Sequence, residues 1–139
     1  MTIRDVLLPL FVEVILTFVL LFWMAFLRTT AIAGGSINTR DIALREPKWP
    51  TKAMQVANCF SNQFEIPVLF YVVTILALST RQADLLFVCL SWLFVVLRYV
   101  HAFIHTTSNR VARRGFVYGL GVLVVMALWV ELALRLYLL

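Results

Sequence analysis

Charge is scarce in this sequence. Only 14% of its 139 residues are charged and 63% are hydrophobic, whereas a soluble domain usually carries about 25% charged residues. This composition excludes a disordered chain and argues against a soluble enzyme, which must keep a largely polar surface. Cysteine is scarce too, because Cys59 and Cys89 are too few for a disulfide scaffold. A membrane protein is the class that remains.

The sequence does contain four long apolar stretches, at about residues 6–27, 53–78, 85–105 and 115–138. Each has roughly the 20 residues that a helix needs to cross a hydrocarbon core. We expect Pro67 to kink the second helix without ending it. Short later connections make consecutive helices antiparallel neighbours. The sequence therefore predicts a single all-α domain over residues 1–139, an integral membrane four-helix bundle.

Basic residues gather in two of the connections. Eight Lys and Arg residues lie in the first and third connections and three lie on the opposite side: Arg28, Arg40, Arg45, Lys48, Lys52, Arg110, Arg113 and Arg114 against Arg4, Arg81 and Arg135. This bias predicts cytoplasmic basic connections and both termini outside the cytoplasm. The net charge of +5 thus reflects orientation in a membrane, and we expect lipids and no nucleic acid as partners. Compact connections without a targeting signal favour a bacterial inner membrane.

Polar residues of the second and third spans occupy one face of each helix. Their spacing is i, i+4, i+7 in one span and i, i+3, i+7 in the other. The two sets are Asn58, Asn62 and Glu65, and Arg98, His101 and His105. An ionisable group inside a membrane costs at least about 2.5–3.5 kcal/mol, so it persists where it pairs or faces a cavity. We expect a polar cavity open to the cytoplasm, with Arg113 and Arg114 at its mouth.

Two ion-pair groups are expected within the bundle. Glu65 and Arg98 lie at comparable depth with opposite charges, and this pair is either mainly structural or part of the cavity. Glu13, Glu131 and Arg135 are expected together near the outer side, where Glu131 and Arg135 have the i, i+4 spacing of an ion pair. This second group is interpreted as structural, with an oligomer contact as the alternative.

Two other site chemistries have less support. His101 and His105 at i, i+4 could share a metal ion, but no nearby Cys, His or acidic set completes a site, so no metal is expected. A small transporter or proton relay could use Glu65, Arg98 and the histidines. Transporters, however, typically have broken helices and internal repeats, and the sequence shows neither.

Two motifs in these spans resemble the MAPEG family, the membrane-associated proteins in eicosanoid and glutathione metabolism. Residues 62–67, Asn-Gln-Phe-Glu-Ile-Pro, resemble the family's Asn-x-x-Glu followed by Pro on the second helix. Residues 98–101, Arg-Tyr-Val-His, resemble its Arg-x-x-His on the third helix, and Tyr118 matches its downstream Tyr. The resemblance covers nearly the whole chain.

The resemblance implies a homotrimer that holds glutathione as co-substrate in a cleft between subunits. Asn62 and Glu65 would contact the tripeptide, Arg98 would couple to Glu65 or reach the tripeptide, and His101 matches the family's His. Arg114, or Arg113 after a shift of one residue, would stabilise the glutathione thiolate. A guanidinium at a helix N-terminus lowers a thiol pKa, and arginines suit the carboxylates of glutathione. The implied activity is that of a transferase or peroxidase acting on a lipophilic electrophile.

The sequence departs from the family pattern at two positions that would help to hold the tripeptide. Asn58 stands where the enzymes often have Arg, and His105 stands where glutathione-binding members carry Tyr. These differences support an alternative, a MAPEG-like protein with a degenerate site. Such a protein would bind a lipid or small anion, or serve a structural role, without catalysis.

We predict that the protein is a trimer, because the convergent polar faces cannot all be satisfied within the four helices of one subunit. Native mass spectrometry of the detergent-purified protein should show three copies of the chain. A spectrum that contains only monomer or dimer would contradict this prediction.

Overall fold

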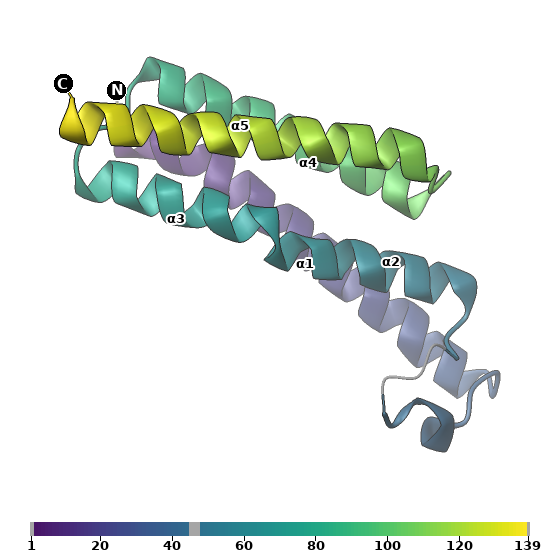
Figure 1. The fold of residues 1–139 in the computed structure, drawn as a ribbon. Helices are drawn as coiled ribbons and strands as arrows, with labels where there is room; N and C mark the ends of the chain where they lie inside the picture. The colour runs from purple at the N-terminus through teal and green to yellow at the C-terminus, as the bar shows by residue number, and fades with distance from the viewer. Residues whose placement is uncertain (1, 45–47, 139) are drawn as a thin grey trace.

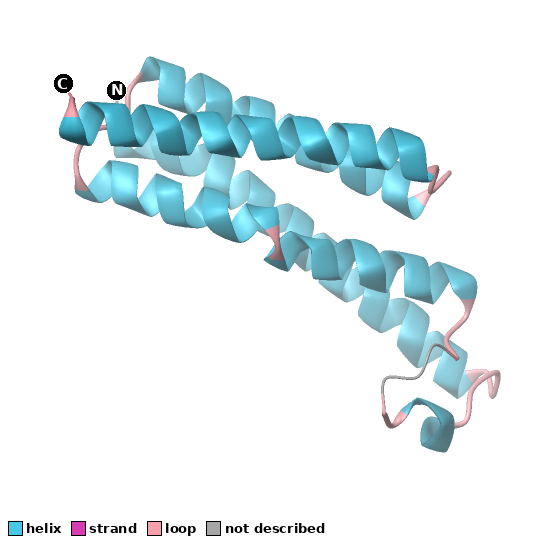
Figure 2. Cartoon of the chain, in the orientation of Figure 1, coloured by secondary structure: helices cyan, strands magenta, loops and turns pink. Residues whose placement is uncertain are grey.

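The structure is a computed structural model that describes residues 2–44 and 48–138 as a helical bundle (Figure 1). Its elements are α1 (Ile3–Ala33), η1 (Thr39–Ile42), α2 (Thr51–Ser61), η2 (Asn62–Phe64), α3 (Ile66–Ser79), α4 (Leu85–Thr106) and α5 (Val111–Tyr137). No strand occurs in this described part of the chain (Figure 2). Arg45, counted above with the basic connection, lies outside the described residues.

Four helical segments among these residues are long and apolar enough to cross a membrane, at Ile3–Ala33, Thr51–Ser79, Leu85–Thr106 and Val111–Tyr137. The predicted all-α fold with four spans is therefore confirmed. The first helix extends six residues beyond the expected end at Leu27, which shortens the long connection. The last helix begins at Val111 instead of Gly115, so Arg113 and Arg114 belong to its first turn.

Local chemistry explains where these helices begin and end. At the start of α1, Thr2 and Asp5 form a reciprocal capping box, which satisfies amide groups that lack a partner in the helix. At the start of α4, the Asp84 carboxylate accepts a hydrogen bond of 2.9 Å from the Phe87 amide. Past the end of α1, Gly35 has φ +71°, a left-handed conformation that glycine adopts without steric cost.

The second span is interrupted and not merely kinked, which corrects the expectation for Pro67. Helix α2 ends at Ser61, one 3-10 turn follows, and α3 begins at Ile66 after Glu65 adopts φ −100° and ψ −108°. Pro67 explains the interruption, because proline has no amide hydrogen and its ring would clash with the carbonyl four residues earlier. Residues 62–65 thus form a step between two α-helices, made of a 3-10 turn and the irregular residue Glu65. The sequence-based argument that broken helices are lacking was wrong.

The helices form two groups that diverge along the bundle. Helices α4 and α5 run together, while α1 lies beside α2 and α3 (Figure 1). Helix α5 packs against α3, whereas α2 packs against α4. We call the end that carries both chain termini the terminal end, and the end that carries the α1–α2 and α4–α5 connections the basic end. Toward the basic end, α5 moves away from α2.

The interior contains two apolar clusters with charged residues between them. The larger cluster joins α1, α3, α4 and α5 near the terminal end, and in it the rings of Phe70 and Phe94 lie 4.7 Å apart. The smaller one joins α1, α2 and α4 around Val56 and Cys59. Glu13 and Arg98 are fully buried between the clusters, at 0% and 2% exposure. Charges at this depth need compensation within the bundle.

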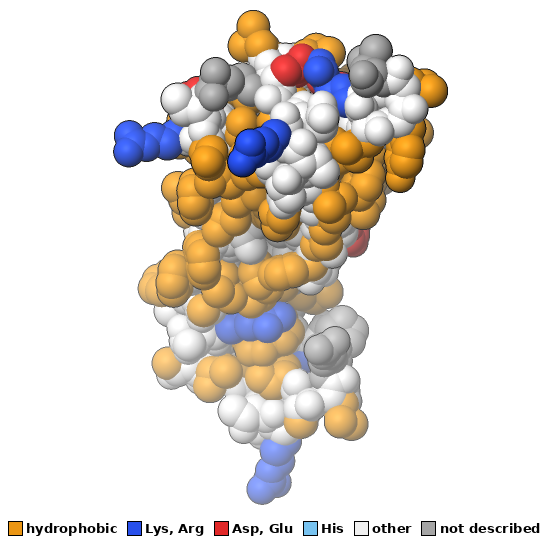
Figure 3. All heavy atoms as spheres, turned by 90° about the vertical axis from the view of Figure 1, so that its left-hand side faces the viewer, with side chains coloured by type: hydrophobic (Ala, Val, Ile, Leu, Met, Phe, Trp, Pro, Cys, Tyr) orange, Lys and Arg blue, Asp and Glu red, His pale blue; other side chains and the backbone are white. Residues whose placement is uncertain are grey.

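The outer surface is apolar, as a membrane requires. One side of α1 exposes five large side chains at 53–69%: Phe11, Ile15, Phe18, Phe22 and Phe26. Seen from the terminal end, hydrophobic side chains cover most of the visible face (Figure 3). Contiguous apolar surface on this scale is unusual for a soluble monomer and natural for helices that face lipid or another subunit. The chain is an integral, multi-pass membrane protein.

The ion-pair group predicted near the outer side, Glu13, Glu131 and Arg135, is found only in part. Arg135 Nε lies 3.2 Å from Glu131 Oε1, which confirms the predicted i, i+4 pair, and the guanidinium also binds Asp84 at the start of α4. Glu13, expected in this group, is instead in the core beside Arg98. The expectation was wrong because Glu13 faces α4, and depth alone does not indicate which helix a side chain faces.

Truncation of a core phenylalanine should destabilise the bundle much more than truncation of a lipid-facing one. We expect Phe70→Ala to lower the free energy of unfolding by about 3 kcal/mol, because Phe70 is fully buried against Phe94 and leaves a cavity. Phe22→Ala, at a residue 69% exposed, is the matched control and should change it little. Denaturant unfolding in detergent measures both, and equal losses would contradict the assigned core.

Candidate functional site

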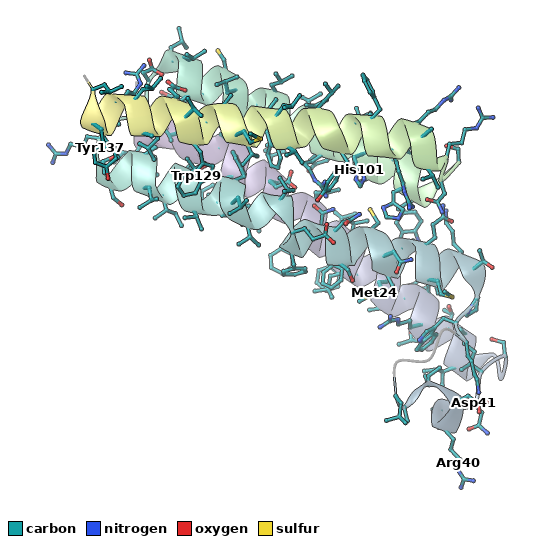
Figure 4. All side chains as sticks on the ribbon, viewed as in Figure 1. Met24, Arg40, Asp41, His101, Trp129 and Tyr137 are labelled. Carbon is teal, nitrogen blue, oxygen red and sulfur yellow. The ribbon has the colours of Figure 1, made fainter. Side chains whose placement is uncertain are left out.

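A polar cleft lies between the interrupted span and helix α5. Its volume is about 270 Å³, and its lining residues are Asn62, Glu65, His101, Arg114, Gly115 and Tyr118. Three separate elements supply them, the 62–65 step, α4 and the first turns of α5. His101 lies toward the end where α2 and α5 diverge (Figure 4). The structure thus brings together five residues that sequence patterns nominated separately.

Glu65 is the centre of the hydrogen bonds in this cleft. The Tyr118 hydroxyl donates to Glu65 Oε2 over 3.1 Å. In the amide orientation that satisfies its neighbours, Asn62 Nδ2 lies 3.0 and 2.9 Å from the two Glu65 oxygens and donates to them. These contacts depend on the interruption, because a continuous helix would place Asn62 and Glu65 differently. The carboxylate stays accessible at the surface of the cleft.

The two histidines lie on the inner side of the cleft, where His101, but not His105, belongs to the lining. Both are buried, and their rings pack edge to face with centroids 5.5 Å apart. The His101 ring also lies 5.7 Å from the Tyr118 ring. His105 Nδ1 is 3.5 Å from the side-chain amide of Asn62. His105 therefore lies behind Asn62 and supports it, whereas His101 reaches the cleft itself.

The structure distinguishes the two arginines of the first turn of α5. Arg114 is half-buried and lines the cleft, whereas Arg113 is exposed and outside its lining. The Arg114 guanidinium donates from Nη1 to the Asn109 side chain. Asn109 has φ +49° in the turn before α5, a conformation that asparagine tolerates better than most residues. This turn holds the guanidinium at the mouth of the cleft.

Arg98 lies behind the cleft and does not line it. Its ion-pair partner is Glu13 of α1, with Nε 3.8 Å from Oε1, so the predicted Glu65–Arg98 pair is wrong. Nη2 of Arg98 donates to the Asn62 carbonyl over 3.4 Å. The guanidinium carbon lies 6.0 Å from the centroid of the Tyr118 ring, within range of a cation–π contact. From the protein interior, Arg98 thus contacts two residues of the cleft lining, Asn62 and Tyr118.

The structure places two residues, Asn58 and Glu13, differently from the sequence-based prediction. Asn58 is exposed one turn before Asn62 and is not part of the cleft lining. Glu13 was missed as a neighbour of this region, because its depth along α1 does not show that its side chain faces Arg98 of α4. Among the described residues, no group of three or more His, Cys, Asp or Glu side chains could hold a metal ion.

An apolar groove continues from the polar cleft toward the terminal end. It follows the seam between α3 and α5, with a volume of about 280 Å³, and its lining residues are Ile66, Leu69, Val122, Val125, Met126, Trp129 and Val130. Ile66 directly follows Glu65, and Val122 lies one turn after Tyr118, so the groove and the cleft adjoin. Trp129 lies nearer the termini on α5 (Figure 4). A polar cleft beside an apolar groove suits two ligands, one polar and one apolar.

Comparison with known proteins agrees with this architecture. The MAPEG family model matches residues 6–134, nearly the whole chain. The chain belongs to the MAPEG family. Family membership suggests a membrane protein related to glutathione or eicosanoid metabolism, and it confirms the resemblance to this family. No curated protein and no solved structure matched the chain.

The hydrogen bond between Tyr118 and Glu65 should stabilise this MAPEG protein measurably. We expect a double-mutant cycle of Tyr118→Phe and Glu65→Gln to give a coupling of about 1 kcal/mol in the free energy of unfolding, since one partner is charged and both are partly exposed. Tyr137→Phe, at a tyrosine 84% exposed, is the control and should be neutral. Additive effects of the two cleft substitutions would contradict the hydrogen bond.

Proposed function

We propose that this MAPEG protein is a glutathione-dependent transferase or peroxidase that acts on a lipophilic electrophile. The observation that carries the proposal is the cleft in which Asn62, Glu65, His101, Arg114 and Tyr118 converge beside an apolar groove. Each half of that arrangement suits one substrate. The polar half suits a charged tripeptide, and the apolar half suits a molecule that arrives from the bilayer.

The polar groups fit the charges of glutathione. Glu65 offers a carboxylate to the glutathione ammonium group, and the amide of Asn62 offers a further polar contact. Arg114 offers the charged donor at the mouth of the cleft, since guanidinium groups bind anionic ligands strongly. Arg98, expected at first as a ligand contact, is buried behind Asn62 and acts on the ligand only through its neighbours.

Arg114 would make the thiol reactive. A thiol is nucleophilic as its thiolate, and a thiol with a pKa of about 8.5 is mostly protonated at neutral pH. A guanidinium in the first turn of a helix adds its charge to the positive end of the helix dipole. The thiolate would then attack an electrophilic carbon, forming a sulfur–carbon bond while the leaving group departs with the bonding electrons. With a hydroperoxide, the thiolate would instead attack the terminal oxygen, forming a sulfur–oxygen bond while the oxygen–oxygen bond breaks and the alcohol leaves as its alkoxide, which takes up a proton. A second glutathione would then attack the sulfenic sulfur, giving glutathione disulfide and water.

The charges of one cleft support the proposed homotrimer. Glutathione carries two carboxylates, and the thiolate adds a third negative charge, whereas the lining of one cleft holds a single Lys or Arg side chain, that of Arg114. A neighbouring subunit would provide further donors and cover the exposed apolar side of the groove. We therefore propose that the cleft is completed between subunits.

The proposed setting is a bacterial inner membrane, with the basic end in the cytoplasm and both termini outside. Arg28 and Lys52 lie over the rings of Trp49 and Trp23 at that end, where tryptophan and basic side chains suit the membrane interface. In this orientation the mouth of the cleft is open to cytoplasmic glutathione.

The degenerate-site function remains the second candidate because specific contacts favour it. Glu65 already accepts hydrogen bonds from Tyr118 and Asn62, so a ligand must share or displace these donors. Asn58 lies outside the cleft lining and His105 behind it. A protein of this kind would bind a lipid or small anion in the same cleft without forming a thiolate.

Arg114→Ala should lower turnover with a chloronitrobenzene-type electrophile, by up to about 25-fold at neutral pH if the guanidinium lowers the thiol pKa by about two units from about 8.5. Glutathione affinity should change less, because the charge acts mainly on the thiolate. Ultraviolet absorbance of the thiolate on adding glutathione reports this step directly. Asn62→Ala should instead weaken binding.

Arg113→Ala is the matched control for this experiment, since Arg113 precedes Arg114 but is exposed outside the cleft lining. It should reduce turnover much less than Arg114→Ala. A wild-type protein that shows neither a thiolate signal nor turnover at millimolar glutathione would refute the enzyme function and favour the degenerate site.

A further inference from the structure

The Glu13–Arg98 pair is the most deeply buried charge pair that the structure describes. Glu13 is 0% exposed and Arg98 2%. Their closest approach is 3.8 Å, too long for a hydrogen bond. Neither Glu13 oxygen, nor Nε of Arg98, has a hydrogen-bond partner among the described residues. The two groups therefore compensate each other mainly by charge.

A pair of this kind is a poor way to stabilise packing. Removing charges from water is costly, and replacing a buried ion pair by well-packed apolar residues is often neutral or stabilising. The apolar clusters on either side of Glu13 and Arg98 could have continued through this layer. The position of the pair therefore calls for an explanation beyond packing.

Arg98 connects Glu13 to the cleft. Its Nη2 donates to the carbonyl of Asn62, at the interruption of the second span, and its guanidinium faces the ring of Tyr118. Both of those residues line the cleft and both contact Glu65. On the opposite side, Glu13 anchors the guanidinium to α1, and Tyr99 donates to the neighbouring Val12 carbonyl over 2.8 Å.

We propose that Glu13 is a positioning residue for the glutathione site: by holding the Arg98 guanidinium in the core, it keeps Asn62 and Tyr118 in their cleft-lining places. This inference rests on the proposed function for the identity of its ligand. Without the Glu13 charge, Arg98 is drawn toward Glu65, the carboxylate on the cleft wall. The guanidinium then competes with the glutathione ammonium group for Glu65 and releases the Asn62 carbonyl.

The test compares two carboxylates that each pair with an arginine, the fully buried Glu13 and the partly buried Glu131. Glu13→Gln should weaken glutathione binding by at least about tenfold, measured by calorimetry on the detergent-purified protein. Glu131→Gln is the matched control, because Glu131 pairs with Arg135 at the terminal end and should leave the affinity within about twofold. Glu13→Asp keeps the charge and should bind more tightly than Glu13→Gln. Wild-type affinity in Glu13→Gln would overturn the proposal.

A double variant separates positioning from a purely structural role. Glu13→Leu with Arg98→Leu removes both charges together, so the bundle should keep its thermal stability, while glutathione binding stays weak because the Asn62 carbonyl and the Tyr118 ring lose their contact. If the double variant binds glutathione as wild type does, the pair is structural only and the proposal fails.

Hydrogen exchange provides a readout that does not need glutathione. In Glu13→Gln, backbone amides of residues 62–66 should exchange at least about tenfold faster, while those in the middle of α5 and the same amides in Glu131→Gln should not change. Unchanged exchange at 62–66 would overturn the positioning role. If wild type binds no glutathione but the exchange result holds, the proposed function fails while Glu13 still positions this step.

Discussion

A guanidinium buried between two apolar clusters needs partners on several sides for its charge and its N–H donors. The contacts that Arg98 makes for this reason organise the bundle. Its contacts reach α1 through Glu13, the interrupted second span through the Asn62 carbonyl and α5 through the ring of Tyr118. Because Arg98 itself belongs to α4, one side chain joins all four membrane spans at a single depth. The polar residues in the interior of the bundle are arranged around Arg98.

The interruption of the second span provides the other half of the arrangement. Pro67 prevents a continuous helix. In the 3-10 turn that results, the Asn62 carbonyl accepts from the Glu65 amide and from Arg98, and the Glu65 carboxylate accepts from Tyr118. The interruption at residues 62–65, which weakens the hydrogen bonding of the helix backbone, thus forms one wall of the cleft. Backbone irregularity inside a membrane is tolerated only where it is buried in protein or lines a cavity. In this segment Gln63 is buried, and Asn62 and Glu65 line the cleft.

Placement of the cleft also explains why one surface could serve two chemically different substrates. The polar residues lie in the part of the bundle where α5 moves away from α2, and the apolar groove follows the seam where α5 stays against α3. A tripeptide from water and a lipophilic molecule from the bilayer would thus meet near Arg114. In the proposed reaction, the membrane would supply one of the two reactants.

Hydropathy and helical periodicity by themselves determined the four spans and the two polar faces, because these depend on neighbours along one helix. Two short motifs, at residues 62–67 and 98–101, indicated the resemblance to the family. Depth also follows from the sequence, since each residue adds about 1.5 Å. From the terminal end, however, Glu13 lies about 15 Å deep, Arg98 about 20 Å and Glu65 about 21 Å, so depth cannot choose between the carboxylates. Only the tertiary structure decided that Arg98 pairs with Glu13, because the choice depends on how α1 and α4 pack and on where the second helix breaks.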